Sequence, residues 1–201
     1  MSKVQTILEA ATTLFARNGY ERTSVAEIAS AAEVANGTVI YHFKSKENLL
    51  HVIAWNTLNA LHRRLHTGLA GGRTGLDAVE RCIKAFYAFV DENPNGVQNF
   101  LADYPMDVTR GRGGSVGHDI TALRSRMLEM LTDCISTGIR DGSIRDVEPI
   151  PAASGVASML IGSAWLIVFN GLTTRHFEEE ALELARGRLA PRLECAENPA
   201  P

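Results

Sequence analysis

The stretch from Ser24 to Leu50, SVAEIASAAEVANGTVIYHFKSKENLL, decides the fold of this chain. Ser24 and Glu27 have the spacing of a capping box, in which a hydroxyl and a carboxylate satisfy free backbone amides at the start of a helix. After a short turn, Val39 and Phe43 stand four residues apart, so they share the buried face of a second short helix. Two short helices joined by such a turn predict a helix-turn-helix unit.

Helices are also predicted on both sides of this stretch. Residues 3–18 form an amphipathic helix, because their apolar side chains fall on one stripe, and Asn18-Gly19 provides a left-handed stop. Ser45 caps a longer helix that ends before Gly68 and joins two domains. The helix-turn-helix is therefore the middle of a compact helical unit.

The rest of the chain repeats the helical spacing. Apolar residues recur three and four positions apart, and strict alternation is hard to find, so we expect an all-α fold without a sheet. A glycine-rich loop is predicted over residues 105–117. The expected organisation is a three-helix domain with the helix-turn-helix over residues 1–47, a second helical domain over 48–192, and a disordered tail over 193–201; the resemblance described below implies that the first binds DNA and the second binds a ligand and forms the dimer.

The composition is that of an ordinary soluble protein, with 201 residues of which 45% are hydrophobic and 21% charged. The three cysteines, Cys82, Cys134 and Cys195, lie far apart and form no C-x-x-C pair, which argues against a disulfide framework and a cysteine zinc site. Glu9 and Arg17 interrupt the N-terminal segment, so no secretion signal is predicted. We expect a cytoplasmic protein without a cofactor or metal.

The formal net charge of −3 does not favour nucleic acid, because duplex binding draws on lysine and arginine. Local counting changes this picture. The segment from Asn36 to Lys46 contains two lysines, one histidine and no acidic residue. The charge pattern therefore permits DNA binding at this segment.

An uncharged run of 26 residues lies between Pro149 and Thr174. A membrane span needs about 20 apolar residues, so the run is long enough to cross a membrane. We favour a soluble protein, because prolines, glycines and serines dilute the run and an apolar helix equally suits a buried core or a subunit contact. A membrane-associated helical protein stays an alternative.

Four stretches of the first fifty residues resemble the signature of TetR-family bacterial transcriptional regulators. They read ILEAA at 7–11, LFARNGY at 14–20, TSVAEIA at 23–29 and GTVIYHFKSKENLL at 37–50. The remaining residues resemble the family in length, helical character and the apolar penultimate helix. The resemblance implies a homodimer joined through its last two helices, a palindromic operator, and a C-terminal domain whose small inducer releases the DNA.

The resemblance also assigns the residues that would face DNA: Ser24, Asn36, Gly37, Thr38, Ile40, Tyr41, His42 and Lys46. The chemistry of most of them agrees. Gly37 lets the backbone approach the duplex closely, and Thr38 can bond a base edge or touch a thymine methyl. Tyr41 can donate to phosphate oxygens, as can His42. The ammonium of Lys46, in the first turn of a helix, can hold a phosphate together with free amides.

Two positions depart from the family pattern. Ala35 stands where similar regulators often have a capping hydroxyl, and we expect Asn36 to supply that cap. Ile40 stands where many have an aromatic residue, and it can read DNA only by apolar contact. Asn36 and Thr38 therefore carry most of the expected base recognition, and the operator sequence is not predicted.

For the inducer, the C-terminal helices supply an apolar and polarizable set that suits a hydrophobic or aromatic ligand: Phe86, Phe89, Phe100, Tyr104, Met127, Trp165 and Phe169. The same residues could simply fill a core. No cluster of arginines marks an anionic ligand.

A helical small-molecule-binding protein or enzyme without DNA binding is the other alternative. Residues 113–117 fit G-x-S-x-G, but a nucleophile elbow needs a preceding buried strand, and the residues before it are polar and glycine-rich. His62 and His66 have the spacing of a metal pair, yet Arg63 and Arg64 oppose a cation. We therefore expect a transcriptional regulator and not an enzyme. A measurement of DNA affinity would distinguish the two.

Overall fold

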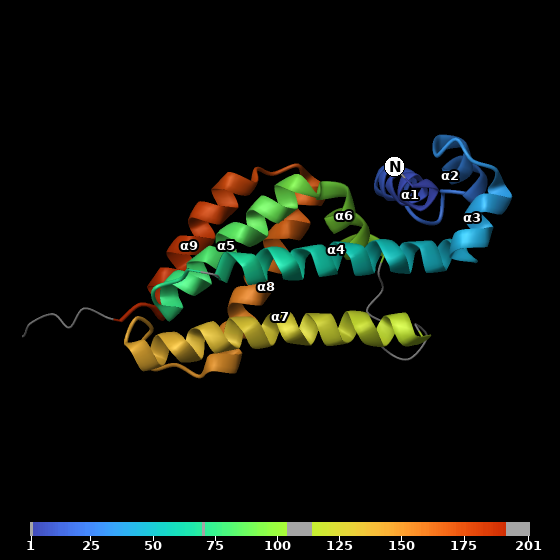
Figure 1. The fold of residues 1–201 in the computed structure, drawn as a ribbon. Coiled ribbons are helices and arrows are strands. Elements are labelled where there is room, and N and C mark those ends of the chain that lie inside the picture. The colour runs from blue at the N-terminus through green and yellow to red at the C-terminus, as the bar shows by residue number, and fades with distance from the viewer. Residues whose placement is uncertain (1, 70, 104–113, 192–201) are drawn as a thin grey trace, which may run out of the picture.

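The computed structural model describes residues 2–69, 71–103 and 114–191, and every regular element in these ranges is an α-helix (Figure 1). The helices are α1 Lys3–Asn18, α2 Val25–Ala31, α3 Asn36–Phe43, α4 Lys46–Leu69, α5 Gly75–Glu92, α6 Pro94–Asp103, α7 Gly114–Asp141, α8 Pro149–Asn170 and α9 Thr174–Leu189. The all-α prediction is confirmed. The predicted disordered tail lies outside the described residues.

Helices α1, α2 and α3 form a small bundle on the first part of α4 (Figure 1). α1 begins after Ser2, whose side chain accepts a hydrogen bond from the amide of Gln5, and it ends at Gly19, whose φ of +85° suits glycine. The predicted bounds of this helix are confirmed. The shared core of the bundle includes Ile7, Ala11, Phe15, Ile28, Val39, Phe43, Leu49 and Ile53.

Helix α4 joins this bundle to the C-terminal helices (Figure 1). Its Leu49 belongs to the N-terminal core, whereas Leu58 packs in a small cluster with α7, and Leu61 belongs to the large C-terminal core. Ser45 caps the helix as predicted, because its hydroxyl accepts a hydrogen bond from the amide of Asn48 at 3.0 Å. One rigid helix therefore contacts both cores.

The predicted end of this helix before Gly68 is wrong, since α4 continues to Leu69. The reason is tertiary packing. A Cβ added at Gly68 would lie 3.1 Å from the Cβ of Ala85, so the glycine allows α5 to approach α4 closely. Propensity alone treats glycine as a helix breaker, and packing overrides it here.

The predicted loop over residues 105–117 is also wrong in part, because α7 begins at Gly114. Its residues 105–113 lie outside the described ranges. Glycine costs about 1 kcal/mol in a helix relative to alanine, which a long helix with one buried face tolerates. The glycine-rich composition was a weaker signal than the amphipathic pattern that follows it.

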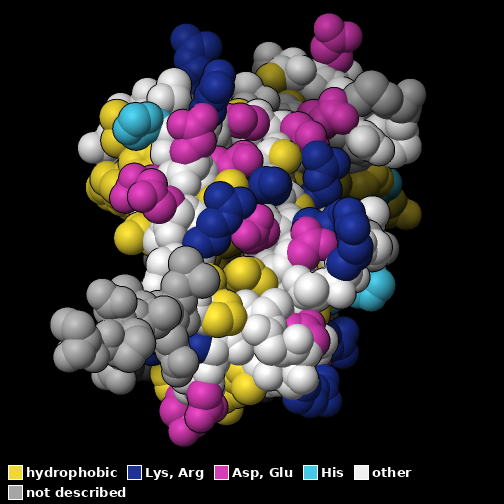
Figure 2. All heavy atoms as spheres, turned by 90° about the vertical axis from the view of Figure 1, so that its left-hand side faces the viewer, with side chains coloured by type: hydrophobic (Ala, Val, Ile, Leu, Met, Phe, Trp, Pro, Cys, Tyr) yellow, Lys and Arg dark blue, Asp and Glu magenta, His cyan; other side chains and the backbone are white. Residues whose placement is uncertain are grey.

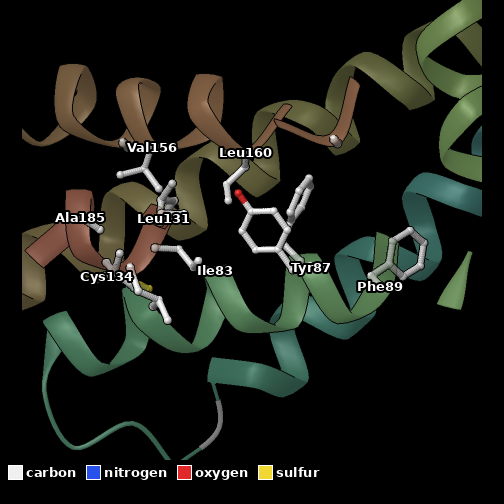
Figure 3. Packing of buried hydrophobic residues seen from close by; sticks show 14 of the residues in the cluster. Ile83, Tyr87, Phe89, Leu131, Cys134, Val156, Leu160 and Ala185 are labelled. Atoms are coloured by element: carbon white, nitrogen blue, oxygen red, sulfur yellow. The ribbon is translucent and has the colours of Figure 1, made fainter. Parts of the chain in front are cut away.

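The C-terminal helices enclose one large hydrophobic core. Figure 3 shows Ile83 and Tyr87 of α5 beside Leu160 of α8 and Leu131 of α7. The buried hydroxyl of Tyr87 lies 2.8 Å from that of Ser163, so the polar end of the ring is satisfied inside the core. Burial raises the pKa of Tyr87.

Helix α8 is the apolar run noted in the sequence, and in the described part of the chain it alone is long and apolar enough to cross a membrane. Less than a third of its most apolar stretch is buried. Ile161 is 50% exposed, Trp165 48% and Phe169 37%. A continuous apolar face therefore lies on the outside of a single chain.

Candidate nucleic-acid interface

The second helix of the predicted helix-turn-helix, α3, has one buried and one exposed face. Val39 and Phe43 point into the core and are almost fully buried. On the opposite face, Tyr41 is 72% exposed and Ile40 is 44% exposed. Such large apolar and aromatic side chains on an exposed helix indicate a binding surface.

The other predicted contact residues of α3 lie around these two. Asn36, Gly37 and His42 are exposed, and Thr38 is half-buried. The structure thus brings six of the predicted DNA-facing residues together on one short helix. The rings of Tyr41 and His42 meet edge to face with centroids 5.1 Å apart, which gives this end of the helix a defined shape.

Lys44 lies beside this surface and was not among the predicted contact residues. Its Nζ donates a hydrogen bond to the carbonyl of Tyr41 at 2.8 Å and lies 5.3 Å from the centre of the Tyr41 ring. Lys44 ends α3 with a φ of +66°, a backbone conformation that L residues rarely adopt. The acid-free segment between Asn36 and Lys46 was the signal that could have identified it.

Ser24 begins α2, and the predicted capping box is confirmed. Its hydroxyl accepts a hydrogen bond from the amide of Glu27, while its own amide and hydroxyl donate to the Glu27 carboxylate at 2.7 and 2.8 Å. These hydrogen bonds lower the pKa of Glu27. Ser24 is exposed at the start of the helix, but its hydroxyl already has partners within the chain.

Lys46 also has partners within the chain. Its Nζ donates to the carbonyls of Tyr20 at 2.9 Å and Thr23 at 3.2 Å, and it lies 4.2 Å from the centre of the Tyr20 ring. An ammonium has three donors, so one remains for a phosphate. Lys46 thereby connects the start of α4 to the turn before α2, and these contacts help to fix the position of α2 relative to α4.

The expectation that Asn36 caps α3 is wrong. Ala35 is the N-cap, with φ −70° and ψ +146°, and no side chain bonds the free amides of this helix end. Asn36 is instead the first residue of α3, and its side chain is exposed. The uncapped end of α3 therefore leaves backbone donors for another partner.

Two amide side chains connect α6 to this bundle. Gln98 donates to the carbonyl of Ala16 and Asn99 donates to that of Thr12, each at 2.9 Å. Asn99 is 1% exposed. The C-terminal helices thus contact the N-terminal bundle through α6 as well as through α4.

The predicted ligand-lining residues divide into two groups. Phe86 and Phe89 are buried in the large core, and Phe100 and Met127 pack on the small cluster between α4 and α7. The aromatic pair Trp165 and Phe169 instead lies on the exposed face of α8, with ring centroids 5.2 Å apart. Tyr104 lies outside the described residues.

The end of the molecule opposite the bundle of α1, α2 and α3 has mixed charge. Figure 2 shows this face, where acidic and basic side chains are interspersed. Such a face presents no continuous basic surface to a polyanion.

Residues 7–53 match the sequence family described as bacterial regulatory proteins, tetR family. A curated relative, the HTH-type transcriptional repressor KstR2 of Rhodococcus jostii (strain RHA1), is 28% identical over 145 residues, which cover 71% of this chain and 69% of that protein. The family match includes all of α2 and α3 and the first turns of α4.

Solved structures match nearly the whole fold. The TetR-family regulator PfmR from Thermus thermophilus superposes with a TM-score of 0.79 at 26% identity, covering 92% of this chain and 99% of that one. AibR in complex with isovaleryl coenzyme A and operator DNA superposes with a TM-score of 0.76 at 21% identity, covering 91% and 97%.

Proposed function

Because the N-terminal domain of this chain belongs to the tetR family of bacterial regulatory proteins, we infer that the chain is a ligand-responsive transcriptional regulator. We propose more specifically that it is a cytoplasmic repressor, that a homodimer binds a palindromic operator, and that a small hydrophobic inducer releases it. The relatives it matches are transcriptional regulators, which favours this function over an enzyme.

The exposed face of α3 is the observation that carries this proposal. Tyr41 and Ile40 project from a helix whose other face is locked in the core by Val39 and Phe43. A helix held in this way can enter the major groove without rearrangement. Tyr41 and Lys44 would contact phosphates, whereas Asn36 and Thr38 would reach base edges.

The homodimer is proposed to form through α8 and α9. Trp165 and Phe169 lie on the exposed apolar face of α8, and Leu184 of α9 is 54% exposed. A surface of this kind on a soluble protein is usually covered by another subunit. This use of α8 also explains its apolar run without a membrane.

The inducer is proposed to bind among the apolar residues of the large core and of the small cluster between α4 and α7. Phe86, Phe89, Phe100 and Met127 offer aromatic and thioether surface there. The isovaleryl coenzyme A complex of AibR supports an acyl group as the probe to test first. A ligand at this site would shift α4 and α6, which both contact the DNA-binding domain.

Such a shift would change the distance between the two recognition helices of the dimer. They must match successive major grooves, roughly 34 Å apart, for both to dock. Because Gln98 and Asn99 of α6 donate hydrogen bonds to α1, a movement of α6 would also move the N-terminal bundle. A mis-spaced dimer would leave the operator.

Selection of genomic fragments by the purified protein, followed by gel shifts, tests this function. We expect Tyr41→Phe and Lys44→Ala to weaken binding across sequences, and the loss of the Lys44 charge to reduce the slope of log affinity against log salt by about 1. Lys84→Ala, which removes an exposed lysine from α5, is the matched control. Unchanged affinity in both α3 variants would contradict the docking proposal.

Acyl coenzyme A thioesters of increasing chain length are then added to the protein–DNA complex. Release of the fragment by one of them supports the proposed inducer class. Retention with every thioester, together with normal DNA binding, overturns the inducer class and leaves the operator function intact.

A further inference from the structure

Two cysteines that are 52 positions apart in sequence meet inside the C-terminal core. Cys134 of α7 belongs to the large hydrophobic cluster and is 8% exposed, and Cys82 of α5 is also buried, with 5% of its surface exposed. Figure 3 shows Cys134 between the two helices. The thiol of Cys82 donates a hydrogen bond to the sulfur of Cys134, so the two sulfur atoms are in contact.

Glycines hold the two helices unusually close at this level. A Cβ added at Gly75 of α5 would lie 2.1 Å from the backbone nitrogen of Gly138 and 2.4 Å from the carbonyl oxygen of Cys134. The backbone of α5 therefore rests directly on the backbone of α7. This close crossing keeps the cysteine pair, Cys82 and Cys134, in contact.

One member of the pair lies beside a surface pocket. Cys134 lines a surface pocket of about 360 Å³ at the end of α4, α5 and α7, together with His66, Met130 and Thr137. Cys82 does not line this pocket. A small solute could therefore reach Cys134 first.

The hydrogen bond makes the two thiols chemically unequal. Donation from Cys82 stabilises a negative charge on its partner and lowers the pKa of Cys134. The same bond and burial raise the pKa of Cys82. Since the thiolate is the nucleophile in thiol oxidation, Cys134 is the sulfur that reacts first.

We propose that Cys82 and Cys134 are a redox modification site, at which hydrogen peroxide converts the pair into a reversible disulfide between α5 and α7. The Cys134 thiolate attacks a peroxide oxygen: a sulfur–oxygen bond forms, the oxygen–oxygen bond breaks, and the departing hydroxide takes a proton to become water. The sulfur of Cys82 then attacks the Cys134 sulfenic acid. The sulfur–sulfur bond forms, the sulfur–oxygen bond breaks, and the leaving hydroxide takes the Cys82 proton as a second water.

The two thiols thus lose two electrons, which reduce one hydrogen peroxide molecule to two waters. The sulfur atoms must move from contact to a bond length of about 2.05 Å, which side-chain rotation and a small helix shift provide. The disulfide would lock α5 to α7, two helices of the proposed inducer domain. A thiol reductant reverses the change.

The test uses the full-length Cys195→Ser chain, in which Cys82 and Cys134 are the remaining cysteines. The folded protein is treated with hydrogen peroxide, denatured, and its free thiols are titrated. We expect both thiols to disappear, dithiothreitol to restore both, and peptide mapping to find Cys82 linked to Cys134 within one chain. Two persisting thiols, or irreversible oxidation of separate cysteines, would overturn the proposal.

Two variants in the same background test the order of reaction. In Cys82→Ala, dimedone should trap a sulfenic acid on Cys134, whereas in Cys134→Ala the Cys82 thiol should survive peroxide. Circular dichroism before treatment confirms that each variant is folded. Equal peroxide reactivity of Cys82 in the folded Cys134→Ala protein would contradict the assignment of Cys134 as the attacking sulfur.

Discussion

At the scale of single residues, the N-terminus of α3 lacks the side-chain cap that would stabilise the helix. Ala35 has the extended backbone of an N-cap but offers no side-chain acceptor. A serine there would accept a hydrogen bond from a free amide of α3, and capping hydroxyls contribute about 1 kcal/mol. Ala35→Ser should therefore raise the free energy of unfolding by about 1 kcal/mol in urea titrations.

The matched control places the same substitution inside a helix. Ala31 is exposed at the end of α2, where serine is a poorer helix former than alanine. Ala31→Ser should leave stability unchanged or slightly lower. An Ala35→Ser protein no more stable than this control would show that the end of α3 gains nothing from a cap.

At the scale of helices, the ion pair between Arg186 of α9 and Glu80 of α5 connects these two helices. Arg186 donates two hydrogen bonds to the Glu80 carboxylate, at 2.8 and 2.7 Å, and they lower the pKa of Glu80 below its ordinary value of 4.5. A carboxylate with a lowered pKa stabilises the fold above its ordinary pKa, and this contribution is lost as the pH falls through the lowered value. The Arg186 side chain is 53% exposed, so solvent screens the pair.

Glu80→Gln should therefore destabilise the protein by about 0.5 to 1 kcal/mol at pH 7. The difference from the native chain should shrink as the pH falls below the ordinary range of a glutamate. Urea unfolding at a series of pH values measures this gap. Glu92→Gln, which removes the more exposed Arg64–Glu92 pair, is the control with a smaller expected effect. If the difference in the free energy of unfolding between the native chain and Glu80→Gln increased in acid, it would contradict the assigned role of Arg186.

At the scale of the whole molecule, the exposed aromatic pair on α8 determines the proposed assembly. Trp165→Glu would place a charge in the proposed subunit contact, where it could not be solvated. We expect this variant to sediment as a monomer and the native chain as a dimer. Loss of the dimer should also weaken operator binding, because a single recognition helix lacks its second half-site.

Ala122→Glu serves as the control, because Ala122 is exposed on α7 and does not belong to α8 or α9. It should leave the dimer intact. A native chain that is monomeric, or a Trp165→Glu chain that remains dimeric, would rule out α8 as the subunit contact.

Much of the fold could be predicted because its signals are local. The capping box of Ser24 and Glu27, the cap of Ser45 and the stop at Gly19 each involve residues within four positions of one another. The exposed face of α3 follows in the same way from the spacing of Val39 and Phe43. The eight candidate DNA residues remain a prediction, although the structure gathers six of them on this helix.

The amino-acid order by itself determined the helical fold, the caps at Ser24 and Ser45 and the outward face of α3, since these depend on a periodicity of 3.6 residues and on bonds between near neighbours. Tertiary structure alone decided the carbonyl partners of Lys46, the helical state of Gly68, the contact of Cys82 with Cys134 and the exposure of Trp165. Each of these depends on which helices pack together and how closely. Side-chain shape in the folded core sets that packing, and no local pattern encodes it.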